Sequence, residues 1–244
     1  MYPVICKIGP FTVYSYGLML ALAVIVASSL AARRARGEGI NPDIIFNLCF
    51  IAVISGILGA RIFYVIENLG YYLDNPAEII MLQHGGLSWF GGMAFGTILA
   101  AVYLKNKKLS FYKILDLLSP FIALGHSIGR VGCLLNGCCF GKPWALGIYF
   151  PAEGRTLIPV QIYASLILVL IFLFLRQLQD RPHKDGQIFY AYLLLYSFAR
   201  FFIEFLRGDH QTLFVGLTLF QFISLAIFCL SVVMLLICRN TRLK

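Results

Sequence analysis

Charged residues are scarce in this sequence. Only 13% of its 244 residues are charged and 60% are hydrophobic, with a mean hydropathy of +0.83. A soluble domain of this size needs far more charge to cover its surface, which excludes an ordinary soluble fold. In lipid the backbone must satisfy its own hydrogen bonds. The composition therefore predicts an all-α, polytopic membrane protein.

The sequence also lacks internal repeats, low-complexity segments and long linkers, so residues 1–244 are predicted to form a single integral membrane domain. About seven stretches are long and apolar enough to be transmembrane helices. They cover residues 11–32, 44–66, 87–104, 111–128, 157–175, 188–206 and 215–238. Positive charge follows the first stretch instead of preceding it, which indicates a membrane anchor and not a cleaved signal peptide.

Lysine and arginine are absent from residues 67–86 but present after the first, third, fifth and seventh spans. The positive-inside rule then predicts an N-out, C-in topology. Segments of about 67–86 and 130–156 are expected to face outward as a small outer cap, the first with room for a short interfacial helix. The net charge is +9, and the lysine and arginine residues that produce it lie mainly at the ends of the spans. No basic face interleaves with aromatic residues, so no nucleic-acid partner is expected.

Several polar residues nevertheless lie in or beside the spans, where an ionisable group costs roughly 2.5–3.5 kcal/mol and by default marks function or a buried pair. They are Tyr16, Arg61, Asp116, His126, Arg130, Arg200 and Glu204. Structural alternatives exist. Arg200 and Glu204 are four residues apart and can form an intrahelical ion pair, whereas Arg61 can snorkel toward headgroups. Asp116, His126 and Tyr16 can be satisfied packing residues.

Two glycine-rich motifs are more specific. Residues 84–92 place His84, which can titrate near neutral pH, beside four glycines. Residues 125–143 combine glycines with Arg130, and backbone N–H groups with a guanidinium can bind phosphate. The alternatives are an interfacial histidine beside a packing seam, and a glycine-rich turn whose arginine meets headgroups.

Cys133, Cys138 and Cys139 form the only cysteine cluster. The cluster lacks paired C-x-x-C spacing, so no metal ligands are predicted, and no cofactor is expected. A disulfide and a packed or functional thiol remain open. Cations gathered at the outer half of the bundle suit an anionic lipid headgroup. The residues alone therefore indicate an outer-leaflet lipid enzyme or a transporter, although transporters usually show repeats or broken helices.

Six motifs in order make the chain resemble the prolipoprotein diacylglyceryl transferase family. They are Tyr16-Gly17-Leu18-Met19, Gly59-Ala60-Arg61, His84-Gly85-Gly86-Leu87, Gly129-Arg130, Pro159-Val160-Gln161-Ile162-Tyr163, and residues 196–209. The resemblance implies a transferase of the bacterial cytoplasmic (inner) membrane whose active site faces outward. It would move the diacylglyceryl group of phosphatidylglycerol to the lipobox cysteine in the signal peptide of a preprolipoprotein, the first step of lipoprotein maturation.

The resemblance also implies roles for residues. His84, Arg130 and Arg200 are the expected catalytic residues. The expected substrate-binding residues are Tyr16, Arg61, Arg130, Gly141, Tyr196 and Glu204. Many family members carry Asn where Cys133 stands and Glu where Cys138 stands. This departure leaves the general base open, with Glu204 or His84 as substitutes. It also keeps two alternatives in view, which are a paralogue with altered lipid chemistry and a lipid-binding transporter.

Overall fold

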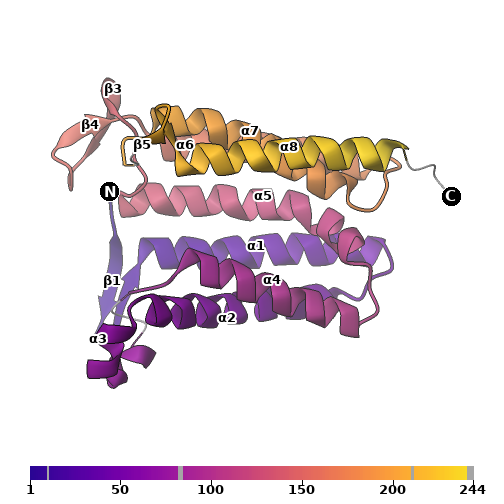
Figure 1. The fold of residues 1–244 in the computed structure, drawn as a ribbon, viewed down its shortest axis with the longest axis horizontal. Helices are drawn as coiled ribbons and strands as arrows, with labels where there is room; N and C mark the ends of the chain where they lie inside the picture. The colour runs from indigo at the N-terminus through magenta and orange to yellow at the C-terminus, as the bar shows by residue number, and fades with distance from the viewer. Residues whose placement is uncertain (10, 82–84, 210–211, 241–244) are drawn as a thin grey trace. The chain divides into compact units, whose positions relative to one another are not determined.

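The computed structural model describes residues 1–9, 11–81, 85–209 and 212–240 and consists mainly of helices (Figure 1). The helices are α1 (Ser15–Gly37), α2 (Pro42–Glu67), α3 (Leu69–Asp74), η1 (Pro76–Ile80), α4 (Trp89–Asn106), α5 (Phe111–Asn136), α6 (Val160–Gln179), α7 (Gln187–Leu206) and α8 (Leu219–Asn240). The described strands form three antiparallel hairpins, which pair β1 (Val4–Ile8) with β2 (Phe11–Tyr14), β3 (Pro143–Phe150) with β4 (Arg155–Leu157), and β5 (Thr212–Phe214) with β6 (Leu217–Thr218).

Six helices in the described part of the chain are long and apolar enough to cross a membrane, namely α1, α2, α5, α6, α7 and α8. This confirms the predicted multi-pass, all-α class. The third predicted span corresponds to α4, which has 18 residues and ends in Lys105 and Asn106. It is not among the six. In the segment after α2, α3 and η1 supply the short helix that was expected there.

The chain divides into two compact units, residues 32–111 and residues 1–31 with 112–244. In the first of these, α2 and α4 lie side by side (Figure 1). Glycines permit this packing, since a Cβ on Gly59 would lie only 2.7 Å from the carbonyl oxygen of Gly91. Small residues that let two backbones approach are a common basis of helix association in membranes.

The other unit contains α5, α6, α7 and α8, and the last three run side by side (Figure 1). Asp116 of α5 accepts hydrogen bonds from the backbone N–H groups of Gly186 (2.6 Å) and Phe189 (2.7 Å), at the start of α7. Its carboxylate therefore satisfies backbone donors that the helix leaves open. Asp116 has a structural partner, as the sequence suggested.

Helix α5 extends to Asn136, well past the predicted end at residue 128, so the first residues assigned to the cap are helical. Gly132 lets this part of α5 pack closely against α1, because a Cβ there would lie 2.9 Å from the Cβ of Met19 and 3.4 Å from the Tyr16 ring. Gly137, with φ of 77°, then ends the helix. The left-handed conformation at that position is typical of a helix C-terminus.

Candidate active site

Arg61 is almost fully buried, with 6% of its surface exposed. Its Nε donates to the carbonyl of Ile79 (2.9 Å), and Nη1 donates to Gly85 (2.6 Å) and Gly86 (2.9 Å). Nη2 donates to the carbonyls of Glu78 (2.5 Å) and Met81 (3.3 Å). A guanidinium has five N–H groups, so these contacts engage its full donor capacity. Arg61 therefore holds the described residues 78–81 and 85–86 through their backbone carbonyls and does not snorkel.

Two glycines of the first glycine-rich motif, Gly85 and Gly86, lie against the Arg61 guanidinium. Gly85 and Gly86 have φ of 81° and 80°, a region that other residues avoid. A Cβ on Gly86 would also lie 2.8 Å from Nη1 of Arg61. His84, the expected catalytic histidine, lies outside the described residues, so its role stays a prediction. The substrate-binding role of Arg61 likewise stays a prediction beside its structural one.

A pocket among α5, α6 and α7 brings together several polar side chains. They are Arg130, Cys139, Gln161, Tyr196, Arg200 and Arg207, and the remaining lining residues are apolar. The space open to a water-sized group is about 20 Å³, roughly enough for one water. Arg130, Tyr196 and Arg200, which the sequence singled out separately, thus meet at one site. Binding of a larger anion requires their side chains to move apart.

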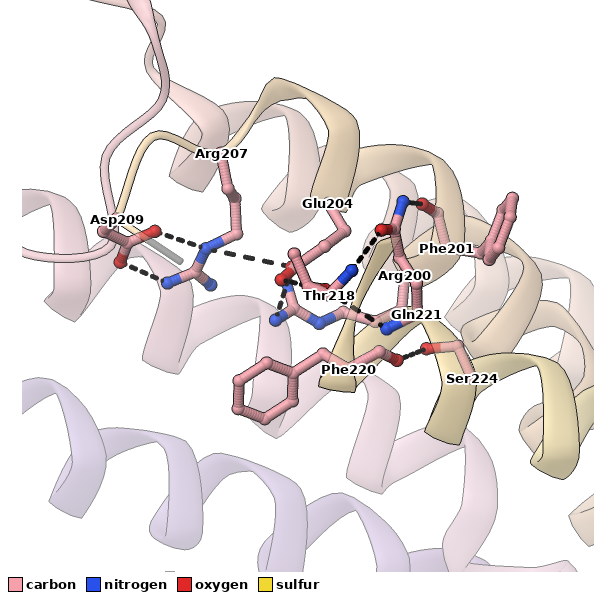
Figure 2. Close-up of polar contacts among 9 residues, drawn as sticks. All are labelled: Arg200, Phe201, Glu204, Arg207, Asp209, Thr218, Phe220, Gln221 and Ser224. Carbon is pink, nitrogen blue, oxygen red and sulfur yellow. Dashed lines mark hydrogen bonds and ion pairs between the residues drawn. The ribbon is translucent and has the colours of Figure 1, made fainter. Parts of the chain in front are cut away.

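Two of the three arginines are already paired (Figure 2). Arg200 Nη2 lies 2.8 Å from Glu204 Oε2, one helical turn along α7. Arg207 Nε donates to Asp209 Oδ1 at 2.8 Å and lies 4.0 Å from the same Glu204 oxygen. The side chain of Glu204 is fully buried, and its Oε1 accepts a hydrogen bond from Thr218 (2.9 Å). The intrahelical ion pair is therefore real and belongs to a larger network.

Arg130 differs from the other two arginines. Its Nε is buried, and no hydrogen-bond partner for it occurs among the described residues. The side-chain oxygen of Gln161 is also buried and has no hydrogen-bond partner among the described residues. The Gln161 amide nitrogen, in contrast, donates to the Cys138 carbonyl at 2.6 Å. Buried polar groups are nearly always paired. The pocket thus presents one donor and one acceptor that a ligand would satisfy.

Gly141 lies behind this pocket wall, where three segments meet. Its N–H donates to the carbonyl of Ile158 at 3.0 Å, and it forms an isolated β-bridge with Arg207. A Cβ on Gly141 would lie 2.6 Å from Val160 and 2.8 Å from the Ile158 carbonyl oxygen. Close packing alone requires glycine here. Its predicted contact with substrate is not tested by this packing and stays a prediction.

The aromatic candidates lie around the arginines. The Tyr196 ring stacks on Tyr192 (5.9 Å between centroids) and lies 5.1 Å from the His126 ring. His126 therefore packs in an aromatic cluster, in keeping with its structural alternative. Tyr16 is 42% exposed and lies against Gly132, two residues beyond Arg130 in α5.

The three cysteines converge at the end of α5. Their Sγ atoms all lie within 4.8 Å of one another, and no disulfide joins them. The pKa of Cys139 is lowered, first because the Cys133 and Cys138 thiols hydrogen-bond its sulfur. Positive charge on Arg207 and Arg130 lowers it further, against the opposing effect of burial. Cys139 also lines the arginine pocket, so the thiol cluster and the anion site adjoin.

Sequence reasoning did not single out Arg207 and Gln161 as site residues, although both lie within quoted motifs. Gln161 is 1% exposed and Arg207 is 7% exposed. A glutamine in the first turn of an apolar span was the available signal for Gln161. Arg207 directly follows a span, where an arginine is usually a topology signal. Only the folding of Asp209 back onto it, and its bridge to Gly141, show that it is buried.

Comparison with known proteins places these observations in one family. Residues 3–237 match the family model described as prolipoprotein diacylglyceryl transferase. The chain is 37% identical to a phosphatidylglycerol–prolipoprotein diacylglyceryl transferase of Clostridium tetani over 92% of this chain and 93% of the relative. It is 38% identical to the one of Finegoldia magna, over 90% of this chain and 88% of the relative. The chain belongs to the prolipoprotein diacylglyceryl transferase family.

Proposed function

We propose that this chain transfers the diacylglyceryl group of phosphatidylglycerol to the thiol of a lipobox cysteine in a prolipoprotein signal peptide. Relatives that align over nearly the whole chain carry this activity in their names. The observation that carries the proposal within the structure is the pocket in which Arg130, Arg200 and Arg207 meet. Three cations in an apolar helix bundle suit an anionic lipid headgroup.

Arg130 is the arginine proposed to bind the phosphate. Arg200 and Arg207 already have carboxylate partners, whereas the buried Nε of Arg130 has none among the described residues. As the carbon–oxygen bond to the phosphate breaks, negative charge grows on the departing glycerol phosphate. A guanidinium fixed beside that charge stabilises the transition state more than the ground state. Arg200, held by Glu204, keeps the pocket electropositive and can approach the phosphate when the pocket widens.

The acceptor must attack as a thiolate. His84 and Glu204 are the residues expected from the family resemblance to take the proton, and both assignments stay predictions. Glu204 is fully buried and ion-paired with Arg200. These contacts give Glu204 a structural role, so His84 is the better of these two candidates.

The acyl chains are proposed to lie in an apolar groove between α6 and α7. Its lining is entirely hydrophobic apart from the Tyr163 hydroxyl, and Ile167, Ala199 and Ile203 line both this groove and the arginine pocket. The space open to a water-sized group in this groove is about 510 Å³. A phospholipid could then keep its chains against the helices while its headgroup reaches the arginines.

The site is proposed to face the outer side of the bacterial cytoplasmic (inner) membrane. We propose that α4 crosses the membrane together with the six longer or more apolar helices, so that the basic segments after α1, α4 and α6 and at the C-terminus all lie in the cytoplasm, as the positive-inside rule requires. Arg130 lies near the C-terminal end of α5, Arg207 directly follows α7, and the β3–β4 hairpin connects α5 to α6. These helix ends are opposite to the ones that carry the basic segments. Export of prolipoproteins to that side would bring the acceptor cysteine to the pocket.

A transfer assay tests the proposal. Purified protein, phosphatidylglycerol and a synthetic lipobox peptide should give a diacylglyceryl mass shift on the peptide cysteine. Arg130→Ala should lower the rate by about 10²–10³-fold, and Arg130→Lys should not restore it, because lysine lacks the planar fork. Arg155→Ala is the matched control, since Arg155 is half-exposed on β4.

The groove is tested in the same assay with Ala199→Trp, which should block lipid entry, against Leu225→Trp on the exposed side of α8. Equal rates for the two tryptophan variants would reject the groove. Normal transfer by folded Arg130→Ala would reject the phosphate assignment. Absence of transfer by the unaltered, folded protein would favour a paralogue with different lipid chemistry.

A further inference from the structure

We propose that Cys133, Cys138 and Cys139 bind one zinc ion as three thiolates, and that the open fourth position accepts the thiol of the substrate cysteine. The inference rests on the proposed transferase function and deepens it, because it assigns a group that generates the thiolate nucleophile. The spacing of these cysteines in the sequence did not predict a metal site. The way α5 ends is what brings them together.

The end of α5 is a Schellman motif. The N–H of Cys138 donates to the carbonyl of Cys133 (3.1 Å), and the N–H of Gly137 donates to the carbonyl of Leu134 (3.1 Å). In this motif the side chains five residues apart, here Cys133 and Cys138, face each other across the helix end. Two sulfurs therefore converge even though four residues separate them in the sequence.

The third sulfur arrives through an unusual backbone conformation. Cys139 has φ of 62°, one of three described non-glycine residues with positive φ. Such a conformation costs of order 1 kcal/mol or more for a residue with a side chain, and it is enriched at functional sites. It leaves the Cys139 sulfur within 4.8 Å of the other two.

These distances are close to those that zinc requires. With zinc–sulfur bonds of about 2.3 Å in a tetrahedron, the sulfurs lie about 3.8 Å apart. Closing the largest gap here therefore needs a movement of about 1 Å. Soft thiolates select zinc or monovalent copper over hard cations, and three protein ligands with one open position are typical of a catalytic zinc site.

The surroundings of the cysteine cluster suit a negatively charged zinc–thiolate group. Zinc with three thiolates carries one net negative charge, and Arg130 and Arg207 line the adjoining pocket. The side-chain oxygen of Gln161, a residue only 1% exposed, has no hydrogen-bond partner among the described residues. Gln161 lines the same pocket as Cys139 and is tied to the Cys138 carbonyl. The Gln161 oxygen can thus accept a hydrogen bond from a group that enters beside the cysteine sulfurs.

The chemical step follows from this placement. A coordinated thiol is deprotonated outright, and its proton passes to solvent. The substrate sulfur then forms a bond to the glyceryl carbon that carries the phosphate, and the carbon–oxygen bond breaks. Its electron pair stays on the phosphate oxygen, so glycerol phosphate leaves with two negative charges beside Arg130. The sulfur becomes a neutral thioether and leaves the fourth position.

The test uses the full-length protein purified in detergent. Elemental analysis should find about one zinc per chain, and Cys133→Ser, Cys138→Ser and Cys139→Ser should each lose it. Cys229→Ser, which removes an exposed cysteine of α8, should keep it. Cobalt-substituted protein should show thiolate-to-cobalt charge-transfer absorption. That spectrum should change with a lipobox peptide containing cysteine but not with the same peptide containing serine.

Four results would overturn the inference. The first is a metal-free protein with all seven cysteines as free thiols. The second is a thiol count lowered by two through a disulfide within the cluster. The third is bound metal whose spectrum ignores the cysteine peptide. The fourth is transfer that continues unchanged after chelator treatment, which would exclude a zinc role while leaving the transferase function intact. Loss of the transferase function would instead appear as no transfer by loaded and stripped protein alike.

Discussion

Replacing Arg61 by lysine separates a structural role from a substrate-binding role. The arginine makes five hydrogen bonds to backbone carbonyls within residues 78–81 and 85–86. Lysine keeps the charge but has only three donors, so at least two of these carbonyls lose their partner. Hydrogen bonds to charged groups contribute about 1.5–3 kcal/mol each. Arg61→Lys should therefore destabilise the fold by about 3 kcal/mol or more.

Thermal unfolding of the purified protein measures this cost. For a chain of this size 1 kcal/mol corresponds to about 2–4 °C in Tm, so the expected drop is about 6–12 °C. Arg155→Lys is the control, since Arg155 is exposed and its ion pair with Glu153 spans 3.4 Å. Surface substitutions of this kind usually stay within about 0.5 kcal/mol.

Activity decides between the two roles. Below the unfolding transition, Arg61→Lys should transfer lipid at nearly the normal rate, because the guanidinium is engaged by the protein's own backbone. An unchanged Tm combined with a large loss of transfer would refute the reasoning. That outcome would mean that Arg61 leaves its carbonyls to contact the substrate.

Three further predictions concern packing, charge and titration. Gly141→Ala should cost about 1–3 kcal/mol and lower the Tm, because the added methyl would lie 2.6 Å from Val160; Gly70→Ala, in open space, should not. Glu204→Gln should destabilise by about 3 kcal/mol, since it leaves Arg200, whose side chain is only 12% exposed, without this countercharge; a Tm equal to that of the unaltered protein would contradict this. The pKa of Tyr71 is raised, first by its hydrogen bond to Glu78 and then by that carboxylate's charge. An ultraviolet titration should therefore show Tyr71 ionising at higher pH than an ordinary tyrosine, and Glu78→Gln should bring it back.

Much of the fold follows from the sequence because lipid imposes strong constraints. Apolar stretches of about 20 residues must form helices, and six of the seven predicted spans meet that expectation in length and hydropathy. Helix ends were less well predicted. Gly129 and Gly132 looked like the start of a loop, yet both lie within α5, and Gly132 lets Met19 and Tyr16 pack closely against this helix. The three hairpins also went unpredicted, since strands this short carry little periodic signal.

The sequence by itself determined that Arg130, Arg200 and Glu204 had to be accounted for, because ionisable groups in apolar spans are costly, and the family resemblance added Tyr196. Only the tertiary structure decided their roles. It paired Arg200 with Glu204 and turned Arg61 toward backbone carbonyls. It left the buried Nε of Arg130 without a hydrogen-bond partner among the residues that the structure describes. It also gathered three cysteines that the sequence spacing kept apart. Contacts of this kind depend on how the chain turns at a helix end and on which carbonyls lie within reach, and no pattern along a single helix encodes them.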